Sequence, residues 1–102
     1  MEGKIDRVDT RDVVLEIGDG IGALIIYTPV ELRGAEIEVS VKGVESPRIH
    51  SVVQERRVGG RPVFAGVFPE LPAGEYRIWT DDPRRPATVT ILSGEVVEVD
   101  WR

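Results

Sequence analysis

The chain contains no cysteine and a single histidine, His50, among its 102 residues. Without cysteine it cannot form a disulfide framework or a thiolate metal site. One imidazole is also too few for a cupredoxin site or a histidine-rich zinc site. No apolar stretch is long enough to span a membrane, and the opening residues lack the apolar segment of a secretory signal. We therefore expect no metal, no cofactor, no membrane partner and a cytoplasmic location.

Lysine and asparagine are scarce or missing: 11 of the 13 basic residues are arginine, and there is no asparagine. Acidic residues outnumber basic ones, so the net charge is −5 and the isoelectric point is near 4.9. A surface of this sign repels a phosphate backbone, and no basic run is interleaved with aromatic residues. Nucleic acid is therefore not an expected partner.

The most informative stretch is the apolar run from Val63 to Phe68, bounded by Gly59-Gly60 and Pro69. Its β-branched and aromatic side chains favour a pleated strand, and the run is too short for a helix. In a strand, alternate residues share a face, which groups Phe64, Gly66 and Phe68 on one side and Val63, Ala65 and Val67 on the other. Two apolar faces predict a strand that is covered on both sides.

The same alternation recurs along the chain and predicts further strands over 12–17, 23–27, 36–42, 49–56, 76–79, 88–91 and 97–101. Within 36–42, Ile37, Val39 and Val41 should point inward. Turn signals separate these segments at short intervals, which is typical of an antiparallel sandwich. We predict a single all-β domain over 1–102, a two-sheet antiparallel sandwich of seven or eight strands, in which residues 1–11 form a loosely held lead-in.

Two short motifs refine this fold. The glycines of 18–22 resemble a phosphate-binding loop, but a strand rather than a helix follows them, so we predict a hairpin turn. Thr28, Pro29 and Glu31 have the spacing of a helix start, with Thr28 as the N-cap, and Gly34 can end it. At most one short helical turn is therefore expected near 28–33.

The corner after the Phe strand also carries a family resemblance. The spacing Phe68-x-x-Leu71-Pro72-x-Gly74-x-Tyr76 resembles the F-x-x-L-P-x-G-x-Y corner of carboxypeptidase regulatory-like domains, in the transthyretin-like (prealbumin-like) superfamily. Leu32-x-Gly34-Ala35-x-Ile37-x-Val39 is similar to a second segment of that family. The resemblance implies a transthyretin-like sandwich. Hydroxyisourate hydrolases share that fold, but their histidines and their C-terminal Tyr-Arg-Gly-Ser motif are absent here.

No catalytic group is predicted. His50 and Ser51 are neighbours in a strand, so their side chains point to opposite faces and cannot form a dyad. No Gly-x-Ser-x-Gly elbow occurs, and the acids do not follow the spacing of a calcium loop. The alternative that stays open is a hydrolase of an unrecognised type that uses His50 with nearby carboxylates.

Trp79 is predicted to point outward beside Arg77, and exposed aromatic residues mark interaction surfaces. One interpretation is a homodimer in which Trp79 and Arg77 join an apolar face made of Val63, Ala65 and Val67. The alternative is that the N-terminal segment covers this face, or that the face packs internally.

A second interpretation is a carbohydrate- or peptide-binding site at Trp79, with rim contacts from Asp81, Asp82, Arg84 and Arg85. These four charged residues also fit a solvated hairpin tip. Taken together, the sequence favours a non-enzymatic binding or assembly module without a cofactor.

Overall fold

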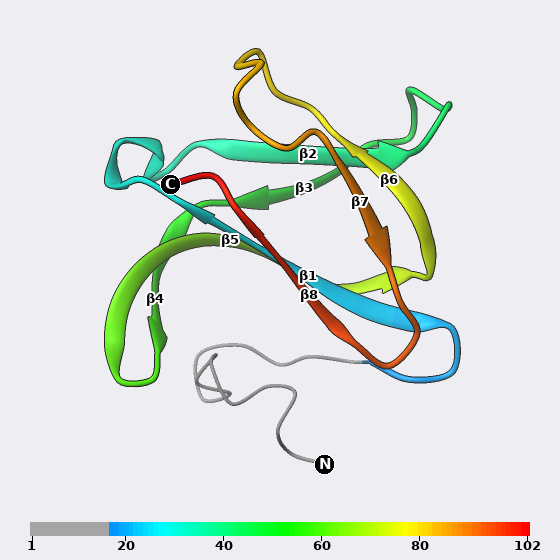
Figure 1. Ribbon diagram of the computed structural model, residues 1–102, viewed down its shortest axis with the longest axis horizontal. Coiled ribbons are helices and arrows are strands. Elements are labelled where there is room, and N and C mark those ends of the chain that lie inside the picture. Colours follow the sequence, from blue (N-terminus) through cyan, green and yellow to red (C-terminus); the bar gives the residue numbers. More distant parts are fainter. Residues whose placement is uncertain (1–16) are drawn as a thin grey trace.

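The computed structural model describes residues 17–102, which form two four-stranded sheets packed face to face (Figure 1). The strands are β1 (Ile21–Thr28), β2 (Glu36–Val41), β3 (Ile49–Val52), β4 (Gln54–Val58), β5 (Arg61–Pro72), β6 (Gly74–Ile78), β7 (Thr88–Ile91) and β8 (Val96–Asp100). The expected lead-in over 1–11 and the expected strand over 12–17, apart from Ile17, lie outside the described residues.

The first sheet has the order β4-β5-β1-β8 and the second sheet the order β3-β2-β6-β7. Five of the six strand pairs are antiparallel, and β1 and β8 pair in parallel. The predicted all-β sandwich is therefore confirmed with eight strands, although one pairing differs from the expected antiparallel pattern.

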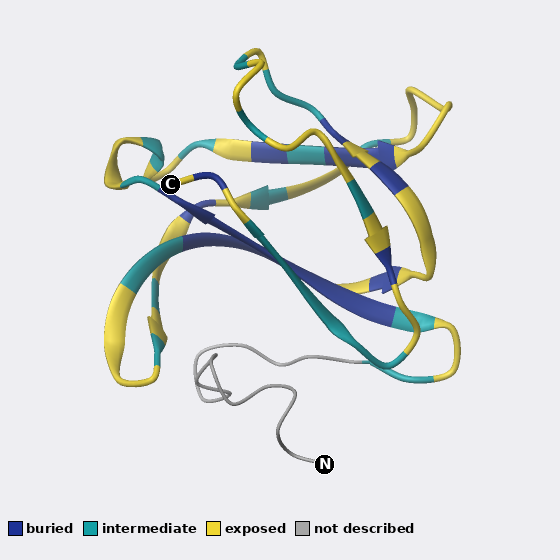
Figure 2. Ribbon diagram, in the orientation of Figure 1, coloured by how far each residue is buried: buried dark blue, intermediate teal, exposed yellow. Residues whose placement is uncertain are grey.

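The hydrophobic core lies between the two sheets. Its members are Leu24, Ile26, Ile37, Val39, Val53, Phe68, Leu71, Tyr76, Ile78, Ile91 and Trp101. Figure 2 shows the buried residues concentrated along β1 and the middle of β5, the two central strands of the first sheet. The predicted strands over 88–91 and 97–101 also contribute to this core, because Val89, Val97 and Val99 pack against it.

A second apolar cluster lies on the outer face of the first sheet. Ile25, Tyr27, Ala65 and Val67 form it, with Val58, Val63 and Val96 packed alongside. Because Phe64 and Phe68 face the main core instead, β5 has apolar residues on both faces, as the sequence predicted.

β5 continues past the point where the sequence predicted its end. Pro69 lacks an N–H and was expected to stop the strand, but the strand runs to Pro72. The pairing of β5 with β1 is irregular here, because the register shifts between Gly22 and Leu24 of β1. A strand tolerates proline at such a bulge, since the regular hydrogen-bond ladder is interrupted there. The corner that follows is closed by the Tyr76 hydroxyl, which donates to the Pro72 carbonyl at 2.7 Å, and burial raises the pKa of Tyr76.

Both predicted glycine turns are tight and use positive φ angles. Gly59 and Gly60, at φ 58° and 81°, join β4 to β5 in a two-residue hairpin. Asp19 and Gly20 also have positive φ, and a bridge joins Gly18 to Ile21 immediately before β1. Residues 18–20 are therefore a turn that leads directly into β1, and no helix follows it; the strand expected before the turn lies outside the described residues, so the hairpin itself stays a prediction.

The predicted strand over 49–56 is in fact two strands that belong to different sheets. The chain crosses from β3 to β4 at Val53, whose side chain is buried in the core. At this crossing the Ser51 hydroxyl donates to the Val67 carbonyl at 2.7 Å and accepts from the Val67 N–H at 2.9 Å. Ser51 thereby replaces a missing strand partner of β5 and joins the two sheets.

Two local expectations were wrong. Thr28 does not cap the short helix: Pro29 precedes the 3-10 turn Val30–Leu32, and the Thr28 hydroxyl donates to the Pro29 carbonyl instead. Val41 was expected inside but is 53% exposed, because it ends β2 next to the 43–47 loop, beyond the edge of the core. The expectation of one short helical turn within 28–33 is confirmed.

Candidate functional site

Trp79 stands on the outer face of the second sheet. It follows β6, in which Ile78 points into the core and Arg77 points outward, and its own backbone N–H donates to the Glu38 carbonyl at 2.9 Å. The indole N–H donates to the Ser40 hydroxyl at 2.9 Å, and Ser40 is only 1% exposed. The ring is therefore anchored to the sheet by its N–H edge.

Both faces of the Trp79 ring are covered by arginine. The guanidinium carbons of Arg48 and Arg77 each lie 3.5 Å from the ring centroid. Two groups at that distance from one centroid would collide on a single face, so they occupy opposite faces. Each contact is a cation–π interaction. We call this arrangement the Arg48–Trp79–Arg77 stack.

The two arginines of the stack differ in their other partners. Arg48 makes an ion pair with Glu38 at 2.8 Å, and its Nε–H donates to the Glu45 carbonyl at 3.2 Å. Arg77 is exposed, its guanidinium lies against the ring, and it bonds to no oxygen within residues 17–102. The five N–H donors of Arg77 are therefore available to a ligand.

A groove of about 560 Å³ lies beside the stack. Its lining includes both tryptophans, Trp79 and Trp101, and the charged side chains of Glu36, Glu38, Asp81, Asp82 and Arg85. Trp101 is held by its indole N–H, which donates to the Pro86 carbonyl at 3.0 Å. The loop over 79–86 is thereby tied to the end of β8 and forms one wall of the groove.

Three of the four predicted rim residues bind one another. Asp82 accepts from the Arg84 backbone N–H at 2.9 Å and from its guanidinium at 2.9 and 3.1 Å, and Arg85 lies 3.7 Å away. These hydrogen bonds from Arg84, with the two positive charges, lower the pKa of Asp82 to about 2. Asp81, Asp82 and Arg85 line the groove, whereas Arg84 lines a neighbouring hollow with Arg102. The loop is therefore both a self-paired turn and a groove wall.

The five residues of the predicted interaction surface do not lie together. Trp79 and Arg77 are on the outer face of the second sheet. Val63, Ala65 and Val67 belong to the cluster on the outer face of the first sheet, where Ala65 is 1% and Val67 7% exposed. The two groups lie on opposite sides of the sandwich, since the main core separates the sheets.

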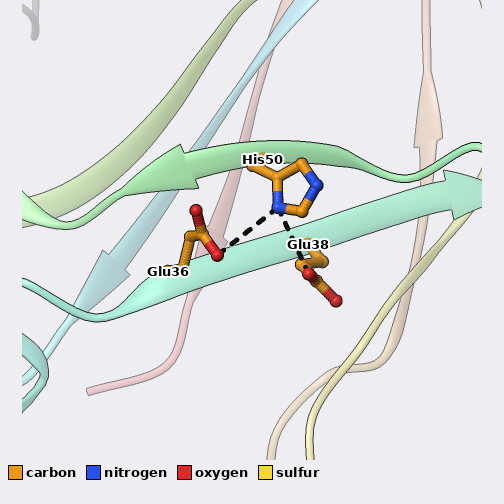
Figure 3. A group of neighbouring side chains, drawn as sticks. All are labelled: Glu36, Glu38 and His50. Atoms are coloured by element: carbon orange, nitrogen blue, oxygen red, sulfur yellow. Dashed lines mark ion pairs between the residues drawn. The ribbon is translucent and has the colours of Figure 1, made fainter.

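His50 lies on β3, at the edge of the same outer face as Trp79. Glu38 is its direct cross-strand partner in β2, and Glu36 precedes Glu38 by two positions on the same side. The His50 Nδ1 atom is 3.2 Å from Glu38 Oε2 and 3.5 Å from Glu36 Oε1 (Figure 3). Ser51 points to the opposite side and contacts β5, so the two side chains lie on opposite faces of β3, as predicted.

Sequence reasoning missed three members of this surface: Arg48, Glu36 and Glu38. Alternation along β2 does place the two glutamates on one outward face, but it is equally typical of a solvated strand. Their proximity to His50 depends on the register of β2 with β3. Arg48 precedes β3, and no local pattern indicates that it reaches Trp79.

No family model, curated protein or solved structure matches this chain. What the protein does must therefore be inferred from its own fold and residues. Within residues 17–102 the structure has no helix that is both long enough and apolar enough to cross a bilayer.

Proposed function

We propose that the protein is a non-enzymatic binding module whose groove beside Trp79 takes a peptide segment that carries a carboxylate. The observation that carries this proposal is Arg77: its guanidinium is held in place by the Trp79 ring, yet it bonds to no oxygen within residues 17–102. A guanidinium fork that is already oriented binds a carboxylate through two parallel hydrogen bonds and loses little side-chain entropy.

The charges around the groove favour a peptide that has both signs of charge. Glu38 is paired with Arg48, and Asp82 is paired with Arg84 and Arg85. Arg77 and the exposed Asp81 have no ion pair within the described residues, so they offer one positive and one negative position. A peptide with an acidic and a basic group complements both.

The Arg48–Trp79–Arg77 stack argues against a carbohydrate ligand that rests on Trp79. A sugar that stacks on tryptophan needs an open ring face, and here Arg48 and Arg77 each cover one face at 3.5 Å. The peptide alternative is therefore the better supported of the two.

The experiment compares acidic peptides, which carry Asp or Glu, with otherwise identical peptides that carry Asn or Gln at the same position. Isothermal titration calorimetry measures the affinity of each. Arg77→Gln should weaken binding of the acidic peptides about 10- to 100-fold, since a charge-assisted hydrogen bond contributes roughly 1.5–3 kcal/mol. Arg61→Gln is the matched control, because Arg61 is exposed at the start of β5 in the other sheet.

Binding that is indifferent to Arg77→Gln, or a response to glycans alone, would remove the support for this proposal. A second copy of the chain is the alternative partner, and sedimentation as a single subunit at micromolar concentration argues against it.

The cytoplasmic location and the kinship with carboxypeptidase regulatory-like domains belong to the same proposal.

One observation favours a second candidate function, a hydrolase that uses His50. The nearby carboxylates that such an enzyme needs are present as Glu36 and Glu38, 3.5 and 3.2 Å from the imidazole. A catalytic base is oriented by a partner within about 2.6–3.2 Å, and Glu38 lies at the upper end of that range. A panel of ester and amide substrates tests it: activity that His50→Ala abolishes supports the hydrolase, and no turnover by the wild type opposes it.

A further inference from the structure

The three side chains of Glu36, Glu38 and His50 bring one nitrogen and two carboxylates to one point on the second sheet. Their ligand atoms all lie within 4.8 Å of one another. Figure 3 shows the imidazole of His50 on β3 turned toward the two carboxylates of β2, with its Nδ1 atom between them. Unlike a patch of acids alone, this group contains an imidazole, which is a preferred ligand for transition metals.

The spacing fits a coordinated ion. Zinc binds imidazole nitrogen and carboxylate oxygen at about 2.0–2.2 Å, so two ligands of a tetrahedral site lie roughly 3.4 Å apart. The Nδ1 atom is 3.2 Å from Glu38 Oε2 and 3.5 Å from Glu36 Oε1. Both nitrogen–oxygen separations therefore match those around a metal ion without movement of the backbone.

Arg48 holds one of the three ligands in place. Its guanidinium binds Glu38 Oε1 at 2.8 Å and is itself fixed against the Trp79 ring. The other oxygen of the same carboxylate, Oε2, is the one directed at His50. A hydrogen bond of this kind orients a ligating carboxylate and fixes which oxygen meets the metal. Glu36, whose side chain is 58% exposed, is free to adjust its rotamer and close the site.

We propose that Glu36, Glu38 and His50 form a surface site for a divalent transition-metal ion, with Zn²⁺ as the best match. The imidazole nitrogen favours Zn²⁺ and similar transition-metal ions over Ca²⁺ and Mg²⁺, which prefer oxygen ligands alone. Three protein ligands leave a coordination position open, as in catalytic rather than structural zinc sites. Glu36 and Glu38 also line the groove, so the proposed site adjoins the space beside Trp79. The inference does not depend on the peptide proposal.

The test is a titration of the purified full chain with ZnCl₂, followed by calorimetry and by the NMR signals of the imidazole. Because His50 is the only histidine, its ring gives one set of signals, and these should shift as one equivalent of Zn²⁺ binds. Glu36→Gln and His50→Gln should each weaken binding at least 10-fold. Glu55→Gln is the control, because Glu55 is an exposed acid on β4 in the other sheet.

Three results would overturn the proposal: imidazole signals unmoved by millimolar Zn²⁺, binding that survives His50→Gln at full strength, or equal affinity for Mg²⁺ and Zn²⁺. Circular dichroism of each variant shows whether it is folded. If Glu36→Gln is unfolded, Glu38→Gln and His50→Gln still decide the result. If the chain binds the peptide but not zinc, the peptide proposal stands and the metal-site proposal is wrong. If it binds zinc but not the peptide, only the peptide proposal is wrong.

Discussion

The two sheets of this sandwich differ in the side chains that their outer faces carry. The central strands of the first sheet, β1 and β5, are apolar on both faces: one faces the core, and the other carries the cluster of Ile25, Tyr27, Ala65 and Val67. The second sheet is apolar only toward the core, and its outer face carries Glu36, Glu38, His50, Arg77 and Trp79. Residues that are not needed for packing are free to recognise a ligand, so the second sheet is where function is expected.

The contrast follows from composition. The central strands of the first sheet, β1 and β5, are nearly continuous apolar runs, whereas β2 alternates charged and apolar residues. A strand buried on both faces must be apolar throughout, and a strand with one solvated face must alternate. The comparison therefore predicts large stability effects in the first sheet and functional effects in the second.

The largest expected effect is in the core side of the first sheet. Phe68→Ala should lower the free energy of unfolding by about 4 kcal/mol, because Phe68 is 1% exposed and the substitution leaves a cavity between the sheets. Urea unfolding followed by tryptophan fluorescence measures this. The matched change on the second sheet is Arg77→Ala, which removes one exposed cation–π contact and should cost at most about 1 kcal/mol. Equal costs for the two variants would break the comparison.

A smaller effect is expected where the two sheets meet. Ser51→Ala should cost about 2 kcal/mol, because it leaves the N–H and the carbonyl of buried Val67 without their hydroxyl partner. Ser93→Ala is the control: its hydroxyl also accepts a backbone N–H, from Gly20, but at an exposed position where water can replace it. If both variants unfold at the same urea concentration, Ser51 does not join the sheets.

The smallest effect belongs to the groove wall and depends on pH. Arg84 lowers the pKa of Asp82 to about 2, below the usual value of about 3.9 in an unfolded chain. The ionised carboxylate therefore stabilises the fold above about pH 4, and this contribution is lost as the pH falls toward 2. Asp82→Asn should lower the Tm at pH 6 and leave it nearly unchanged near pH 2.

Thermal unfolding at several pH values measures this difference. Asp81→Asn is the control, because Asp81 is the exposed neighbour without an ion pair in the described chain. A Tm difference for Asp82→Asn that stays constant from pH 6 to pH 2 would contradict the assignment. High salt should reduce the effect, since the pair is solvent-accessible.

Much of the fold could be predicted from local pattern. Alternation identified both faces of β5 and the inward residues Ile37 and Val39 of β2, and a glycine pair marked the turn before β5. On the outer surface, the position of Trp79 beside Arg77 followed from the same period of two. The family resemblance at the Tyr76 corner stays a prediction, as does the cytoplasmic location.

By itself, the sequence determined that this chain forms strands, which residues they bury and where glycine and proline turn them, because these depend on neighbours a few positions apart. Only the tertiary structure decided that the chain changes sheets at Val53 and that β1 and β8 run in parallel. It also decided that Arg48 reaches Trp79 and that His50 reaches Glu38. Those features depend on which strands pair and in which register, and pairing energies come from contacts between residues far apart in the chain, which no local pattern encodes.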